Sequence, residues 1–249
     1  MPMSNESTEA RLPSDAASAA QAVREEARFG IAFLRRRWRR LLLVFLGLLL
    51  PLWAFGELAD EVHEAEAFPF DAPILRFAHE LAHDGFDRVF LLSSQLGYHY
   101  GVVPFDIVLV LALALRRKLR EGLFAGVAIV GSALLNLATK QVFARTRPSL
   151  WESIAPESTY SFPSGHAMGS MAMAAVLVLL AWHTRWRWWV ALPAMAFVAM
   201  VGLSRVYLGV HYPSDILAGW AAALAWTVAV YALVFSRLRP WRAGIPPAG

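Results

Sequence analysis

Residues 204–235 read SRVYLGVHYPSDILAGWAAALAWTVAVYALVF. The first part of this stretch carries Ser204, Arg205, His211 and Asp215, whereas residues 216–235 contain no charged side chain. An apolar helix of about 20 residues is long enough to cross the hydrocarbon core of a bilayer. The stretch therefore predicts a membrane helix that begins directly after a group of reactive polar side chains.

Apolar segments of similar character recur along the chain, and 57% of its 249 residues are hydrophobic, which is above the average for soluble proteins. Several segments are shorter than a full span, so we expect them to extend into their flanks or to tilt. The sequence predicts an all-α, polytopic membrane bundle of about six transmembrane helices. The expected segments are about 41–56, 98–115, 122–139, 167–182, 188–203 and 216–235.

The charged loops predict how these segments are oriented, because positive charge accumulates on the cytoplasmic side of a membrane. Basic clusters at 35–40, 116–120, 185–187 and 237–242 fall on one side of a six-span arrangement, and the acidic segment 57–87 falls on the other. We expect an integral protein of a bacterial inner (plasma) membrane with both termini in the cytoplasm. The net charge of +4 is explained by this orientation, so no nucleic-acid partner is expected.

The expected organisation has three parts. Residues 1–35 form a cytoplasmic polar and amphipathic tail, with a helix at about 16–40; residues 36–239 form the membrane domain; residues 240–249 form a short cytoplasmic tail. A cleaved signal peptide is the alternative for the N-terminal region. The late start of the apolar stretch and the proline at position 51 disfavour it.

Polar residues with ordered spacing gather on the predicted outer side, in three groups at two connections between spans. The topology was derived from other residues, so this agreement is independent support for a site there. The three groups are Lys140 with Arg147-Pro148, then Pro163-Ser164-Gly165-His166, and finally Ser204-Arg205 with His211 and Asp215.

These residue types suit the transfer of a phosphoryl group. Its transition state spreads negative charge over three oxygens, which Lys140, Arg147 and Arg205 can stabilise. Ser164 and Gly165, at the expected start of a helix, offer a hydroxyl and amide donors to an anion.

The two histidines can divide the remaining roles. Asp215 can orient His211 as a nucleophile, while His166 protonates the leaving group and then activates water. Taken singly, these residues also have structural interpretations: a snorkelling cation, a turn with a helix cap, or an interfacial histidine. Arg145 either joins the cations or pairs with an acidic loop residue, and it stays outside the predicted catalytic set.

Neither a metal nor a cofactor is expected. The chain has no cysteine. His79 and His83, in an expected amphipathic helix at 71–83, have the spacing of a metal pair, but no third ligand supports one, so surface histidines are the favoured interpretation.

The three groups resemble the signature of the PAP2 (type-2 phosphatidic acid phosphatase) superfamily, KxxxxxxRP, PSGH and SRxxxxxHxxxD, and the resemblance extends over about 90–235. It implies a helical bundle with a core like that of PAP2 phosphatases and haloperoxidases, and a metal-independent phosphatase with a phosphohistidine intermediate on His211. It further implies His166 as the leaving-group acid and Asp215 as the partner of His211. The implied phosphate ligands are Lys140, Arg147, Ser164, Gly165 and Arg205.

Membrane members of this family act on lipid phosphates such as phosphatidic acid, phosphatidylglycerophosphate or undecaprenyl pyrophosphate. We therefore expect an integral membrane lipid phosphatase that cleaves a phosphomonoester or pyrophosphate at the outer face. The alternatives are a lipid phosphotransferase that uses the same phosphohistidine, a vanadate haloperoxidase, and a lipid-binding protein without catalysis.

Overall fold

The computed structural model describes residues 24, 28, 35, 37, 38 and 41–235. The helix expected at 16–40 falls largely outside these residues, and the tail at 240–249 falls wholly outside them. The chain divides into two units, Met1–Leu43 and Val44–Gly249. The second unit contains all the predicted site residues and is described below by itself.

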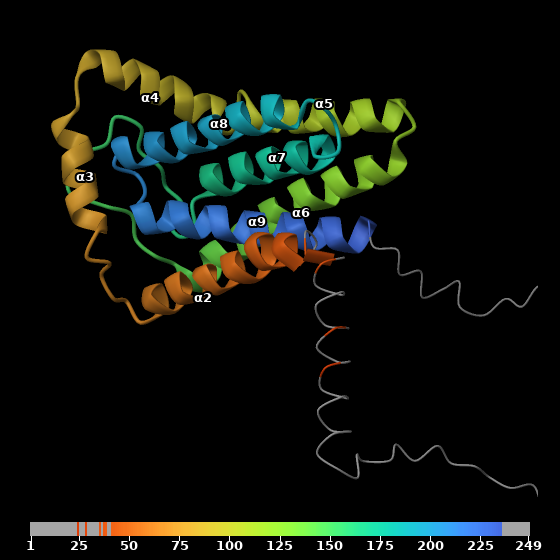
Figure 1. Ribbon diagram of the computed structural model, residues 1–249. Coiled ribbons are helices and arrows are strands. Elements are labelled where there is room, and N and C mark those ends of the chain that lie inside the picture. The colour runs from red at the N-terminus through yellow and green to blue at the C-terminus, as the bar shows by residue number, and fades with distance from the viewer. Residues whose placement is uncertain (1–23, 25–27, 29–34, 36, 39–40, 236–249) are drawn as a thin grey trace, which may run out of the picture. The chain divides into compact units, whose positions relative to one another are not determined.

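The described part of the second unit is built from helices, with no β-strand among its described residues (Figure 1). A short π-helical turn, η1, leads into the first long helix. The elements are η1 (Phe45–Leu49), α2 (Leu50–His63), α3 (Asp71–Glu80), α4 (Asp84–Leu96), α5 (Val102–Leu115), α6 (Leu119–Phe143), α7 (Gly165–Ala181), α8 (Arg187–Tyr207) and α9 (Pro213–Phe235).

Each of the six predicted apolar segments is helical in the structure. Four helical stretches are long and apolar enough to cross a membrane: Leu41–His63, Leu119–Phe143, Arg187–Tyr207 and Pro213–Phe235. The helices Val102–Leu115 and Gly165–Ala181 are apolar but shorter. The all-α membrane architecture is confirmed, while the count of six spans stays a prediction.

The acidic segment between the first two predicted spans forms two helices. The expected amphipathic helix is present as α3. The second helix, α4, was not predicted, and it begins where Nδ1 of His83 accepts a hydrogen bond from the Gly85 amide at 3.1 Å. His79 stacks on Trp151 with ring centroids 4.2 Å apart. The two histidines therefore act as a ring partner and a helix cap.

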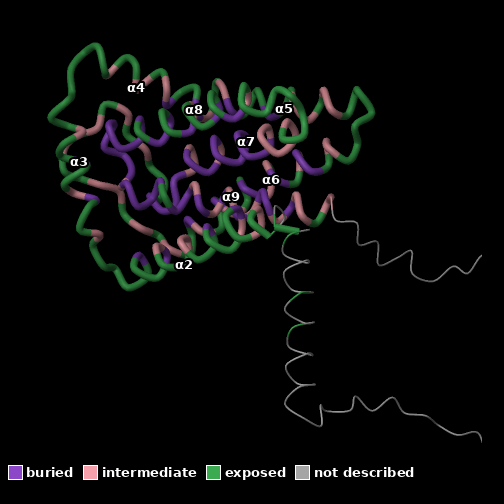
Figure 2. The backbone as a smooth tube through the Cα atoms, in the orientation of Figure 1, coloured by how far each residue is buried: buried purple, intermediate pink, exposed green. Residues whose placement is uncertain are grey.

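The centre of the unit is formed by α7 and α9, which are buried along much of their length, while α2 to α5 expose more of their surface (Figure 2). Small residues allow this close packing, since a helix rich in alanine, glycine and serine lets neighbouring backbones approach. A Cβ added at Gly219 of α9 would lie 2.9 Å from the carbonyl oxygen of Ser164. This contact brings the start of α7 against the first turns of α9.

The two ends of the helical bundle differ in charge. The basic α5–α6 connection and the α7–α8 connection lie toward the end away from α3 (Figure 1). The helix α3, from the acidic segment, packs against α8 and α9 at the other end. The predicted site residues lie toward this α3 end, where α6 and α8 finish and α7 and α9 begin.

Candidate active site

Two connections and the start of α7 meet at the α3 end of the bundle and bring the predicted residues together. The loop 144–164 follows α6, α7 begins at Gly165, and residues 208–212 join α8 to α9. Several charged side chains are buried here, although burial of a charge is costly unless the charge is paired. The buried members of the predicted set are Lys140, Ser164, Arg205, His211 and Asp215.

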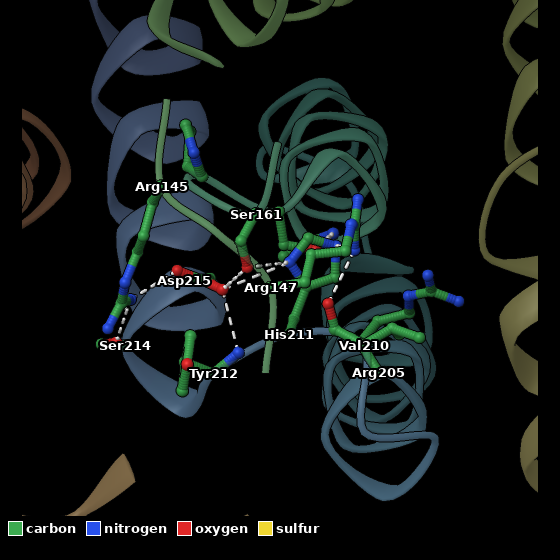
Figure 3. Close-up of polar contacts among 12 residues, drawn as sticks. Arg145, Arg147, Ser161, Arg205, Val210, His211, Tyr212, Ser214 and Asp215 are labelled. Carbon is green, nitrogen blue, oxygen red and sulfur yellow. Dashed lines mark hydrogen bonds and ion pairs between the residues drawn. The ribbon is translucent and has the colours of Figure 1, made fainter. Parts of the chain in front are cut away.

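His211 and Asp215 form the centre of this cluster (Figure 3). Nδ1 of His211 lies 3.3 Å from Oδ2 of Asp215, and Nη1 of Arg147 lies 3.1 Å from Nε2 on the other side of the ring. A guanidinium only donates hydrogen bonds, so Nε2 must be the acceptor and the ring proton must sit on Nδ1. The lone pair of Nε2 therefore faces the cationic side of the site.

The surroundings of His211 keep its imidazole neutral. Burial, followed by the positive charges of Arg147 and Arg205, lowers the pKa of His211 well below its ordinary value of 6.5. A neutral imidazole, whose Nε2 lone pair here accepts from Arg147, is the form that can attack phosphorus once that hydrogen bond is released. The geometry thus gives His211 the protonation state that a nucleophile needs.

The chain reaches this geometry by a tight reversal after α8. Gly209 has a φ of 67°, and a Cβ at this position would lie 2.6 Å from Cζ2 of Trp151, so the turn requires glycine. The amide of Val210 donates to the carbonyl of Arg205 at 3.2 Å. Pro213 then begins α9, as expected from the sequence, and places Asp215 in its first turn.

The positive charges of the three predicted cations act on the buried His211, and each cation is anchored by hydrogen bonds to other parts of the chain. Arg147 donates from Nη1 to the carbonyl of Val210 at 2.7 Å and from Nε to the carbonyl of Thr159 at 2.6 Å. Lys140 donates to Oγ1 of Thr159 at 3.1 Å. Arg205 donates from Nη1 to Ser94 of α4. Helix α4 thus supports a cation of the site.

A carboxylate that sequence reasoning missed lies among these cations. Oε2 of Glu157 is 2.8 Å from Nη2 of Arg147, and Oε1 accepts a hydrogen bond from Nη2 of Arg205. Nδ1 of His166 is 4.0 Å from Oε1. Burial alone would raise the pKa of Glu157, but the positive charges, led by that of Arg205, lower it overall, so this carboxylate is ionised.

The predicted phosphate ligands Ser164 and Gly165 lie at the N-terminus of α7. Oγ of Ser164 accepts from the Ala167 amide at 3.4 Å, and the Ser164 amide donates to the carbonyl of Asp215 at 3.1 Å. Ser164 is therefore the cap of α7 and also ties this helix to α9. The role of both residues as phosphate ligands stays a prediction.

Arg145 is a second residue whose importance the sequence did not indicate. It pairs with Asp71, as expected for an arginine beside an acidic segment, with Nη2 3.0 Å from Oδ2. It also pairs with Asp215, with Nη1 2.6 Å from Oδ1, and donates to Oγ of Ser214 at 2.8 Å. Ser161 donates to the other carboxylate oxygen of Asp215. The carboxylate of Asp215 is thus held on both sides.

Known proteins show the same combination of fold and sequence. A sequence model described as the PAP2 superfamily matches residues 121–239. Phosphatidylglycerophosphatase B from Bacillus subtilis is 28% identical over 172 residues, which are 67% of this chain and 84% of the relative. A decaprenylphosphoryl-5-phosphoribose phosphatase from Mycobacterium tuberculosis is 35% identical over 143 residues, which are 54% of this chain and 76% of the relative.

A solved structure agrees with these sequence matches. The crystal structure of a transmembrane PAP2-type phosphatidylglycerolphosphate phosphatase from Bacillus subtilis has a TM-score of 0.66 and 26% identity to this chain. The similarity covers 76% of this chain and 98% of the solved one.

Proposed function

Because this chain belongs to the PAP2 superfamily and is an integral membrane phosphatase, we propose that it hydrolyses a phosphomonoester or pyrophosphate of a lipid through a phosphohistidine on His211. The observation that carries this proposal is the arrangement around one imidazole ring. Its Nδ1 lies 3.3 Å from Asp215, and its Nε2 lies 3.1 Å from Arg147. A phosphate bound to the cations would face this lone pair.

The first half of the reaction transfers the phosphoryl group to the enzyme. Nε2 of His211 attacks phosphorus, a P–N bond forms, and the P–O bond to the lipid breaks. The negative charge of the bound phosphate counters the burial and the neighbouring positive charges that lower the pKa of His166, so His166 enters protonated and gives its proton to the departing oxygen. Arg147, Arg205 and Lys140 stabilise the negative charge on the phosphoryl oxygens, and Asp215 stabilises the imidazolium that forms.

The second half releases inorganic phosphate. His166, now neutral, accepts a proton from water as the water oxygen attacks phosphorus and the P–N bond breaks. His211 returns to its neutral form, and His166 is protonated again. Every proton and electron pair is accounted for by these two histidines, the lipid and one water molecule.

Two cavities support a substrate with a hydrocarbon chain. A cavity of about 210 Å³ opens beside His166, Arg205 and Glu157, and its lining includes Gln95 and Tyr100. An apolar groove of about 270 Å³ begins at the neighbouring Leu96, and its lining includes Val102, Phe105, Leu177 and Phe197. The relatives named above act on lipid phosphates, according to their names. A lipid phosphate is therefore the proposed substrate class.

The proposed location follows from charge. The basic connections between helices lie at the end of the bundle away from the site, and basic loops favour the cytoplasm. We therefore place both termini in the cytoplasm and the site at the outer face of a bacterial inner membrane. An introduced cysteine at Ser158, in the exposed part of loop 144–164, should be labelled from outside intact cells by a reagent that does not cross membranes. Labelling only after the cells are opened would contradict this orientation.

The activity is tested with the full-length protein in detergent and EDTA. Phosphate release is measured from phosphatidic acid, phosphatidylglycerophosphate and undecaprenyl pyrophosphate. His211→Ala should lower the rate by at least about 10³-fold, because the nucleophile is lost. His183→Ala, which removes an exposed histidine at the α7–α8 connection, is the matched control and should retain the rate. Undiminished release by His211→Ala would contradict the proposal.

A further inference from the structure

Glu157 occupies the space between the two arginines that are proposed to bind the substrate phosphate. One carboxylate oxygen accepts from Nη2 of Arg205, and the other lies 2.8 Å from Nη2 of Arg147. Two oxygens of one anion shared between two guanidinium groups is the geometry with which arginines hold a phosphate. The carboxylate of Glu157 thus occupies the position that the substrate phosphate is proposed to take.

The hydrogen-bond donors of the two arginines explain why Glu157 and a phosphate compete. Nη1 and Nε of Arg147 are used by the carbonyls of Val210 and Thr159, and Nη1 of Arg205 is used by Ser94. Both Nη2 groups contact Glu157, and that of Arg147 also donates to Oγ1 of Thr159 at 2.9 Å, while Nε of Arg205 has no hydrogen-bond partner among the described residues. A phosphate that is held by both Nη2 groups must therefore replace Glu157.

The side chain of Glu157 also lies beside a cavity into which it can move. Its side chain is 28% exposed, whereas that of Arg205 is 2% exposed. It lines the cavity of about 210 Å³ described above, together with Gln95, His99 and Tyr100. The loop is anchored on both sides of Glu157, by the hydrogen bond from Ser153 to the carbonyl of Leu208 and by the contacts of Thr159. The carboxylate can therefore leave while the anchored loop and the helices stay in place.

We propose that Glu157 is an internal competitor for the phosphate pocket, which raises the affinity that a ligand needs to enter it. The inference rests on the proposed function, because it requires that the pocket accepts phosphate. A terminal phosphate with two charges and three free oxygens binds the arginines tightly enough to displace the single charge of Glu157. A phosphodiester has one charge and two free oxygens, so it binds the arginines less tightly and displaces Glu157 less often at the same concentration.

This competition has a consequence for an enzyme embedded in a membrane. The phospholipids around it are mostly phosphodiesters, present at very high local concentration. A carboxylate that fills the pocket for most of the time lowers the occupancy of every ligand, so a weakly bound diester leaves the pocket largely free. Glu157 thus keeps the bulk lipids of the bilayer from filling the pocket.

The test measures binding instead of turnover. Full-length protein in detergent is titrated with inorganic phosphate, and separately with dimethyl phosphate, by calorimetry. Glu157→Gln should bind inorganic phosphate about tenfold more tightly than the wild type, as expected if the carboxylate fills the pocket roughly nine-tenths of the time. Its affinity for dimethyl phosphate should rise by a similar factor, because the carboxylate competes equally with every ligand of the pocket.

A matched control separates competition from general electrostatics. Glu152 lies exposed in the same loop and makes no ion pair with the site arginines in the described structure, so Glu152→Gln removes the same charge from outside the pocket. It should bind phosphate like the wild type. Glu157→Ala should behave like Glu157→Gln, and thermal unfolding without ligand checks that each variant is folded.

The possible results distinguish a failure of this inference from a failure of the proposed function. Equal or weaker phosphate binding by both folded Glu157 variants would overturn this inference, as would an equal gain in Glu152→Gln. If the wild type releases phosphate from lipids while the Glu157 variants bind it no more tightly, only this inference fails. If neither wild type nor variants bind phosphate or release it from lipids, the proposed function fails as well.

Discussion

Arg145 holds the carboxylate of Asp215 from the side opposite His211. Its Nη1 lies 2.6 Å from Oδ1 of Asp215, while Oδ2 of the same carboxylate lies 3.3 Å from Nδ1 of His211 (Figure 3). Each oxygen thus has its own charged or polar partner, and the carboxylate has little freedom to rotate. Because Arg145 also pairs with Asp71 at the start of α3, this helix is linked to the catalytic carboxylate.

Replacing Arg145 should therefore affect the chemical step more than substrate binding. Arg145→Gln should lower kcat by about 10- to 100-fold, the usual effect of removing a group that orients a catalytic residue, with little change in KM. Arg145→Lys should restore part of the rate, because lysine restores the positive charge but not the planar guanidinium that can hold two oxygens at once. Steady-state kinetics and thermal unfolding of both variants check this. A rise in KM at unchanged kcat would show that Arg145 contacts the substrate instead.

The pH dependence of the reaction should reflect the lowered pKa of His211. Burial, and then Arg147, favours the neutral imidazole, so His211 remains a nucleophile below pH 6.5 and loses activity only when a still lower pH protonates it. The acidic limb of the profile of kcat/KM should lie below pH 6.5. Removing the positive charge with Arg147→Gln should raise the pKa of His211 and move this limb to higher pH. An acidic limb at the same pH in Arg147→Gln as in the wild type would contradict the assignment of this limb to His211.

The turn at Gly209 should tolerate no side chain. Gly209→Ala imposes a φ of 67° on alanine and places a Cβ 2.6 Å from Trp151, so we expect destabilisation of at least about 1–2 kcal/mol and a marked loss of activity. Gly56→Ala is the control, because its Cβ would meet nothing within 4 Å. It should leave stability unchanged or raise it by about 0.5–1 kcal/mol, since alanine favours helices. Thermal unfolding in detergent compares the two, and equal stability would contradict the account of the turn.

Apolar periodicity and motif spacing in the sequence predicted the main helices and the residues that meet at the candidate site. The six apolar segments are helical, and the motif residues meet because Lys140 ends one helix while Ser164 and Pro213 begin others. The helix α4 was missed because its longest apolar run has only four residues, Val89 to Leu92, and the helix begins within the acidic segment.

The contact of Arg145 with Asp215 and the position of Glu157 could not be predicted for a different reason. Both residues lie in the loop 144–164, which has no helix of its own. The path of this loop is set by contacts with residues distant in sequence, such as Asp71, Val210 and Leu208. Local sequence carries no signal for these contacts.

The central claim is that His211 carries the phosphoryl group between the two halves of the reaction. The most direct measurement incubates the full-length protein briefly with a lipid substrate labelled in its terminal phosphate, stops the reaction in alkali, and locates the label by mass spectrometry. We expect a phosphoryl group that is stable in alkali and labile in acid on the peptide containing His211, and none in His211→Ala. A protein that turns over the substrate while its label is found on another residue, or on none, would contradict the account.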